Sequence, residues 1–429
     1  MKLRDAGLFA LVALLIVLTG VMQSWNLALQ VLNMGLISAI MALGVNLQWG
    51  FAGLFNVGVM GFVALGGLAV AITAMPPVPE AWSAGGARVL LAMVVAGATI
   101  AGAVAIWRKR PKARGWLVAA LIVVGFIFYR FLFDPARDAI EAVNPALQGN
   151  LGGLGIPVLL AWPIGGLLAA GAAWLIGKTA LGLRSDYLAI ATLGIAEIII
   201  AIMKNEDWLA RGVKNVIGIP SPLPSAIELQ QGAGFAERAA SWGADAVTAS
   251  TIAVKLGYAG LFAAVLILLL VLMQLALNSP WGRMMRAIRD NETAAEAMGK
   301  NVTKRHLQIF VLGSAICGIA GAMMTTLDGQ LTPGTYQPLR FTFLIWVMVI
   351  VGGSGNNYGA VLGGFLVWFL WVQVEPMGQW LIGTLTSGLP EGDLKQHLLG
   401  SAAYMRLFTM GVLMLIVLRF SPRGLIPER

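Results

Sequence analysis

The sequence predicts an all-α polytopic membrane protein with about 10 to 12 transmembrane helices, some of them broken by glycine or re-entrant. Of its 429 residues 58% are hydrophobic and 11% are charged, whereas a soluble globular chain carries roughly 25% charge. Several apolar runs approach the roughly 20 residues that a helix needs to cross a bilayer. Lys and Arg number 29 against 20 acids, an excess that is typical of cytoplasmic loops rather than of nucleic-acid binding. We therefore expect one membrane domain over residues 1–429.

Apolar periodicity and polar breaks divide the chain into candidate spans. The first follows Lys2 and Arg4 and continues almost at once into a second apolar run, so we predict an uncleaved span rather than a signal peptide. Because the glycine-rich run 352–359 follows a short segment, residues 341–374 form either two passes or a re-entrant hairpin. The predicted segments are 8–24, 27–47, 51–75, 89–107, 115–129, 157–177, 187–203, 256–277, 307–327, 341–352, 357–374 and 407–418.

Charge predicts the orientation, because basic residues concentrate in short cytoplasmic loops. If all segments cross and the N-terminus is cytoplasmic, the inside loops hold most of the 29 Lys and Arg. These include the basic run at 108–114 and the arginines of the connection at 278–306. Both termini are then cytoplasmic, and residues 204–255 form an external loop region with short helices.

The chemistry inventory points away from a catalytic site. Glu197 is the single acid within the predicted spans, which hold no Lys, Arg or His; ion-coupled carriers usually place ionisable groups there. Glu197 either lines a polar path, bonds to a neighbouring helix or reaches the interface. The sole cysteine forms no internal disulfide, and His306 and His397 lack metal-ligand spacing. The run Gly177-Lys178-Thr179 looks like the end of a phosphate-binding loop, but the first glycine of that motif is missing, so we do not expect an ATP site here. We expect no metal, no catalytic residue and no cofactor bound by this chain.

The connection at 278–306 carries a stronger signal. Ser279 and Pro280 are good N-cap and first-turn residues, and arginines follow at three-residue spacing. A second helical stretch, 292–298, stops at Gly299, a residue suited to a left-handed C-terminus. The pattern predicts a short helical element with a charged and an apolar face. It either lies at the lipid headgroups or docks a soluble partner.

Residues 279–299 resemble the coupling loop of ABC importer permeases, and more narrowly that of the LivM-type branched-chain amino acid permease family. Most of the chain shares the resemblance: residues 185–194 with Glu197, 218–220, 310–321, 352–359 and 422–425. Residues 55–62 and 66–68 depart from the motif usual in these permeases, which bears on the substrate more than on the fold. The region 89–129 looks like extra spans on the family core.

The resemblance implies a transport subunit of the bacterial inner membrane, not an enzyme, for branched-chain or related amino acids. Its implied partners are a second homologous permease subunit, two cytoplasmic ATP-binding subunits that carry ATP and Mg, and a periplasmic solute-binding protein. The implied ATPase-coupling residues are Arg283, Arg286, Arg289, Glu292, Glu296 and Gly299. The alternatives are a urea or short-chain amide permease within the class and a stand-alone secondary transporter outside it.

Two glycine-interrupted segments, 44–67 and 352–364, form the second feature. Such segments in the two halves of a transporter mark unwound helices along a path, or else close packing through small residues. The candidate translocation path comprises Asn46, Gln48, Asn56, Glu197, Gly353 and Asn356.

Overall fold

The computed structural model describes residues 3–109, 114–145, 149–183, 185–241, 243, 245–387 and 392–428. Residues 110–113 of the predicted basic run, and residues 388–391 between the last two predicted segments, lie outside the described residues. Twelve helices dominate the fold: α1 Leu3–Met22, α2 Trp25–Val45, α3 Val59–Ala74, α5 Ala87–Lys109, α6 Arg114–Glu141, α7 Val158–Ala180, α8 Ser185–Asn205, α12 Ala246–Asn278, α15 Val302–Asp328, α16 Pro338–Gly352, α17 Asn357–Leu385 and α19 Met405–Phe420.

The all-α membrane fold is confirmed. Among the described residues ten helical stretches are long and apolar enough to span a membrane, and α3 and α16 are shorter apolar helices. Helices α16 and α17 pack side by side and are joined by the short turn at 353–356. This arrangement gives two antiparallel helices at 338–385.

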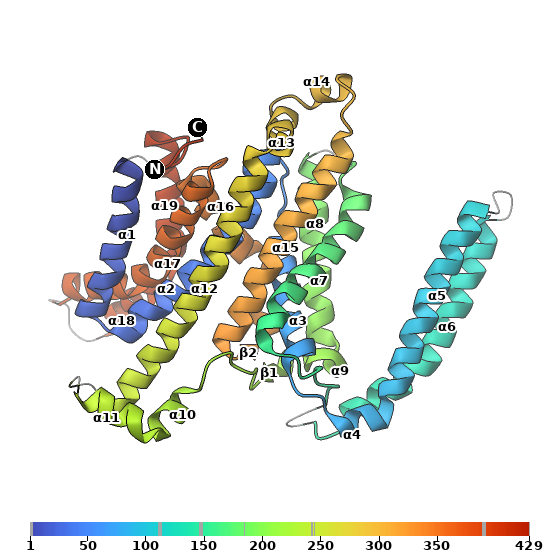
Figure 1. Cartoon of the computed structure of the whole chain (residues 1–429), viewed down its shortest axis with the longest axis horizontal. Helices are drawn as coiled ribbons and strands as arrows, with labels where there is room; N and C mark the ends of the chain where they lie inside the picture. The colour runs from blue at the N-terminus through green and yellow to red at the C-terminus, as the bar shows by residue number, and fades with distance from the viewer. Residues whose placement is uncertain are drawn as a thin grey trace.

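Both chain ends lie at one end of the bundle, together with the short helices α13 (Pro280–Asp290) and α14 (Glu292–Ala297) (Figure 1). We call this the α13 end. The opposite end, the α10 end, carries α4 (Pro79–Ala81), α9 (Asp207–Ala210), α10 (Ala226–Gln231) and α11 (Ala233–Ser241). There β1 (Val216–Ile217) pairs antiparallel with β2 (Gln330–Leu331), which attaches the 206–245 segment to the end of α15.

Small residues bring the central helices close together. A Cβ atom at Gly66 of α3 would overlap the carbonyl of Gly318 on α15, and one at Gly321 would overlap the carbonyl of Val63. Helices in lipid associate largely through such close van der Waals packing. Helix α2 is the most enclosed of the spans, with 83% of its apolar window buried. The core therefore forms around α2, α3, α7, α15 and α17.

Helices α5 and α6 form a hairpin that stands away from this bundle (Figure 1). Their apolar windows are only 11% and 6% buried within the chain. The attachment is at the α10 end, where Phe133 and Ile140 of α6 pack with Trp208 and Leu151. Helix α6 runs to Glu141, twelve residues past the predicted 129, with Pro135 inside it.

Two predicted boundaries are wrong for local reasons. The segment 51–75 is not one continuous helix: Gly53 has a φ of +71°, and the Asn56 side chain accepts a hydrogen bond from Gly58 N, so the chain is non-helical from 53 to 58 and α3 starts at Val59. Helix α2 ends instead in a π-helical turn, Asn46–Gly50. At the other boundary α12 begins at Ala246 rather than near 256, because Asp245 caps its first turn. Two further short pieces, α18 (Asp393–Gly400) and the 3₁₀ turn Ser401–Tyr404, precede α19.

Candidate functional site

The α13–α14 pair presents one face to the bundle and one to solvent. Met285 and Ile288 are 0% and 1% exposed and pack into the core, while Arg283 is exposed. On α14 Glu292 and Glu296 are exposed, and the Met298 side chain just beyond it is 79% exposed. Met298 is thus an exposed apolar side chain within a charged stretch of the chain. We call Arg283, Glu292, Glu296 and Met298 the α13–α14 rim.

Local sequence explains this shape. Ser279 occupies the N-cap position, but its hydroxyl donates back to the Ala276 carbonyl at 2.6 Å instead of capping α13. Asn291 caps α14 by accepting from Ala294 N at 2.9 Å. Gly299 adopts a φ of +75°, the left-handed conformation expected of it.

The three arginines do not share one face. A step of three residues falls about 60° short of a full turn in a helix of 3.6 residues per turn, so successive arginines rotate around α13. Among the residues that the structure describes, Arg283 donates only to the Asn278 carbonyl, at 3.2 Å, and its side chain remains exposed. Arg286 is half-buried and lines a cavity of about 280 Å³ with Gln274 and Asn357. Arg289 points into the bundle.

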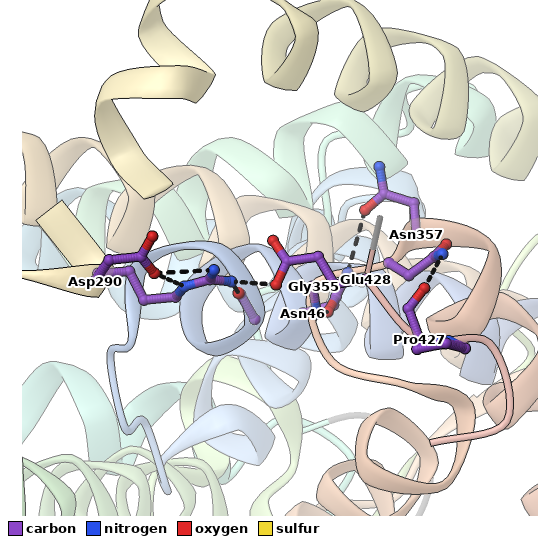
Figure 2. A network of polar contacts seen from close by, with 9 residues as sticks. Asn46, Asp290, Gly355, Asn357, Pro427 and Glu428 are labelled. Carbon is purple, nitrogen blue, oxygen red and sulfur yellow. Dashed lines mark hydrogen bonds and ion pairs between the residues drawn. The ribbon is translucent and has the colours of Figure 1, made fainter. Parts of the chain in front are cut away.

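Arg289 is the centre of a polar network that joins four segments (Figure 2). Its guanidinium donates to the Gly50 carbonyl at the end of the π-turn and pairs with Glu428 at 2.9 Å. It also donates to Asp290 Oδ1 at 3.1 Å. Burial disfavours the charged form, but the bonds to Glu428 and Asp290 outweigh it and raise the pKa of Arg289 above its ordinary value. The charge is therefore permanent, and Arg289 ties α13 to the break after α2 and to the C-terminal tail.

The second helix break joins the same network. Asn46 Nδ2 donates to Asn357 Oδ1 at 3.1 Å, and Asn46 Oδ1 accepts from Gly355 N at 2.9 Å. The π-turn and the α16–α17 turn are thus bonded directly to each other, although they are about 310 residues apart in sequence. The side chain of Asn356 caps α17 and donates to the Pro427 carbonyl at 3.0 Å.

The C-terminal tail closes this region. Leu425 N and Ile426 N donate to the Val351 and Gly352 carbonyls, both at 2.9 Å. Gly353 has a φ of +122°, and a Cβ atom there would overlap the Ile426 carbonyl. Glycine is therefore required where the tail crosses the α16–α17 turn.

The remaining predicted path residues lie in two different settings. Gln48 and Asn56 are each 1% exposed; Gln48 donates to the Phe310 carbonyl at 2.9 Å and accepts from Asn56 at 2.9 Å. Glu197 is exposed on α8 and lines an open groove of about 600 Å³ with Lys204 and Arg340. The structure thus gathers Asn46, Gly353 and Asn356 at the two breaks and places Glu197 apart from them. Their role along a path stays a prediction.

Sequence reasoning missed Glu428, Gly50 and Asn357 as partners in this network. Pro422 and Arg423 signalled only that the last span ends, and a tail following a last span carries no pattern that predicts its partner. His306, a buried residue of α15, lines a cavity of about 520 Å³ with Arg289 and Glu292. No group of three or more His, Cys, Asp or Glu side chains within the described ranges is placed to hold a metal ion.

Comparison with known proteins adds independent evidence. The family model described as "Branched-chain amino acid transport system / permease component" matches residues 27–146 and 142–418. The high-affinity branched-chain amino acid transport system permease protein LivM of Escherichia coli is 30% identical over 253 residues, 57% of each chain. The "Probable branched-chain amino acid transport permease protein LivM" of Methanocaldococcus jannaschii is 27% identical over 331 residues, 74% of this chain and 85% of that one.

More distant similarity extends to sugar permeases. The fructose import permease protein FrcC of Rhizobium meliloti is 31% identical over 132 residues, 28% of this chain and 37% of that one. No solved structure matches the chain. The first of the LivM alignments covers little more than half of the relative, but the family model covers nearly the whole bundle. The chain therefore belongs to the branched-chain amino acid transport system permease family and is a multi-pass membrane protein.

Proposed function

We propose that this chain is the membrane-spanning permease subunit of an ATP-driven importer that moves branched-chain or related amino acids across the inner membrane. The observation that carries the proposal is the α13–α14 pair, exposed on one side and bonded through Arg289 to both helix breaks on the other. The names of the LivM relatives supply the substrate class.

The α13–α14 rim fits a soluble partner better than a lipid surface. Its exposed charges include the acids Glu292 and Glu296, which an anionic headgroup layer would repel. Met298 is an adaptable apolar side chain that can anchor in a groove of a partner. We infer that residues 278–306 form a cytoplasmic coupling loop that docks an ATP-binding subunit.

The rest of the assembly follows from this orientation. The termini lie at the α13 end and are then cytoplasmic, while the 204–255 region at the α10 end is external and available to a periplasmic solute-binding protein. A second homologous permease subunit and two ATP-binding subunits complete the importer. ATP and Mg bind to those subunits, and this chain contributes movement of α13 relative to the breaks.

Uptake of labelled leucine tests the transport assignment. Cells that lack their own importer receive this permease with its neighbouring subunits, with and without excess valine or urea. We expect leucine uptake that depends on ATP. Excess valine should block this uptake, and excess urea should not. A correctly assembled complex that takes up urea, an amide or a sugar but not leucine would refute the substrate class and keep the importer.

Cysteine labelling tests the docking surface. The native Cys317 is 1% exposed, so a thiol introduced at Met298 is the reactive one in this chain. Modification of Met298→Cys by a maleimide is expected to slow at least fivefold in the assembled complex. The control is Ser241→Cys on α11 at the α10 end, where the ATP-binding subunits have no effect. Equal labelling of Met298→Cys with and without those subunits would contradict this docking surface.

A further inference from the structure

An apolar cavity opens between α2, α3, α15, α16 and α17 and shares no residue with the Arg289 network. The volume of the cavity, counted as the space that the centre of a water molecule can reach, is about 110 Å³. Methionines form much of its wall, namely Met34, Met41, Met60, Met324 and Met348, with Phe341 and Leu344 beside them. A wall of this kind suits a branched or irregular apolar group, because methionine side chains adjust their shape easily.

A few polar groups stand in this apolar wall. Asp328, the last residue of α15, lines the cavity and is exposed, and its carboxylate has no hydrogen-bond or ion-pair partner among the described residues. The indole N–H of Trp368 is buried and also lacks an acceptor within the described part of the chain. Buried donors are nearly always paired. The Ser38 hydroxyl lies in the same wall.

The position of Asp328 gives the cavity a direction. Asp328 is the last residue of α15, directly before β2 at the α10 end, whereas Met60 lies in the first turn of α3 and Met348 about one turn before the end of α16. In the proposed orientation the α10 end is the external side, from which an imported solute arrives. A solute entering from there meets a negative charge first and an apolar wall behind it.

We propose that this cavity is a binding site for a neutral apolar amino acid, with the α-ammonium group beside Asp328 and the side chain among the methionines. The proposal rests on the importer assignment above and adds a site to it. A ligand site is typically a mostly apolar cavity with a few placed polar groups, as here. One water needs about 10–15 Å³ of such space, so the cavity has room for roughly seven to eleven waters, which is enough for a whole leucine or valine.

Cysteine protection tests the site without requiring transport. Ser38→Cys is nearly isosteric, and the buried Cys317 leaves a silent background. The complete complex in proteoliposomes is treated with methyl methanethiosulfonate, with and without saturating leucine. Leucine is expected to slow modification of Ser38→Cys at least fivefold and to leave Ser83→Cys, an exposed position outside the 204–255 region, unchanged. Failure of leucine to protect Ser38→Cys, or absence of labelling without leucine, would overturn the site.

A charge variant tests the role assigned to Asp328. Asp328→Asn is expected to raise the leucine concentration for half-maximal uptake about tenfold or more, since a charge-assisted contact is lost. Asp393→Asn changes another acid at the α10 end and is the matched control. It should leave the leucine concentration for half-maximal uptake unchanged. Unchanged uptake by Asp328→Asn would refute the site while the importer stands. Protection of Ser38→Cys in a complex that does not transport leucine would refute the importer assignment while the site stands.

Discussion

Replacing Arg289 should separate docking of the ATP-binding subunits from transmission of their movement. Arg289→Gln removes the ion pair to Glu428 and the bond to the Gly50 carbonyl, but leaves the α13–α14 rim intact. Bonds to a charged group contribute about 1.5–3 kcal/mol each. The Arg289 and Glu428 side chains are 24% and 31% exposed, so solvent screens the pair in part and we take the low end. The loss is about 2–3 kcal/mol for the link between α13 and the two breaks.

A link weakened by that amount corresponds to a fall in ATP-driven uptake of roughly 30-fold or more if each transport cycle passes through it. The assay is leucine uptake per assembled complex, with the ATP-binding subunits quantified by co-purification. Arg289→Lys keeps the charge but loses the forked geometry of the guanidinium. Its uptake should therefore lie between that of the unmodified chain and that of Arg289→Gln. Arg283→Gln is the matched control, since it should weaken co-purification instead. Two results for Arg289→Gln would refute this role of Arg289 in transmitting movement. One is uptake within twofold of normal, and the other is loss of co-purification of the ATP-binding subunits.

Three further outcomes are expected. Gly353→Ala forces a Cβ onto the Ile426 carbonyl at a φ of +122° and should lower the unfolding temperature of the detergent-solubilised protein by several degrees, whereas Gly383→Ala, which has open space, should not. Gln48→Leu leaves the buried Asn56 side-chain amide without its acceptor and should destabilise the protein by about 1–3 kcal/mol, measured by denaturant unfolding; a change below about 0.5 kcal/mol would contradict a stabilising role for the Gln48–Asn56 bond. Met298→Asp should reduce co-purification of the ATP-binding subunits without changing the unfolding temperature, because Met298 is 79% exposed.

Local pattern predicted much of the secondary structure. Long apolar runs gave the spans, and the Pro280 and Gly299 signals placed the short helices α13 and α14 within a few residues. These features depend on neighbours in sequence, which one chain displays directly. Two of the boundaries that failed depend on a single backbone angle or cap: Gly53 at positive φ delayed α3, and the Asp245 cap advanced α12.

The polar residues of the breaks show where sequence reasoning stopped. Asn46 and Gln48 were recognisable as polar groups in apolar segments, which marks them as special but leaves their partners open. Their partners, Asn357 and Phe310, are hundreds of residues away and are chosen by helix packing. A buried amide that bonds within the protein and one that faces a path look the same in a sequence.

By itself, the sequence determined the membrane class, the number of apolar segments, the expected side of the charges and the short helical pair at 280–297, because hydropathy, charge and capping are properties of consecutive residues. Tertiary structure alone decided that Arg289 turns inward while Arg283 stays exposed, and that the tail residue Glu428 meets it. It also decided that five methionines from four helices and Asp328 enclose one cavity. Those contacts join segments whose spacing in sequence carries no information about their distance in space, since the packing of glycine-rich helices sets it.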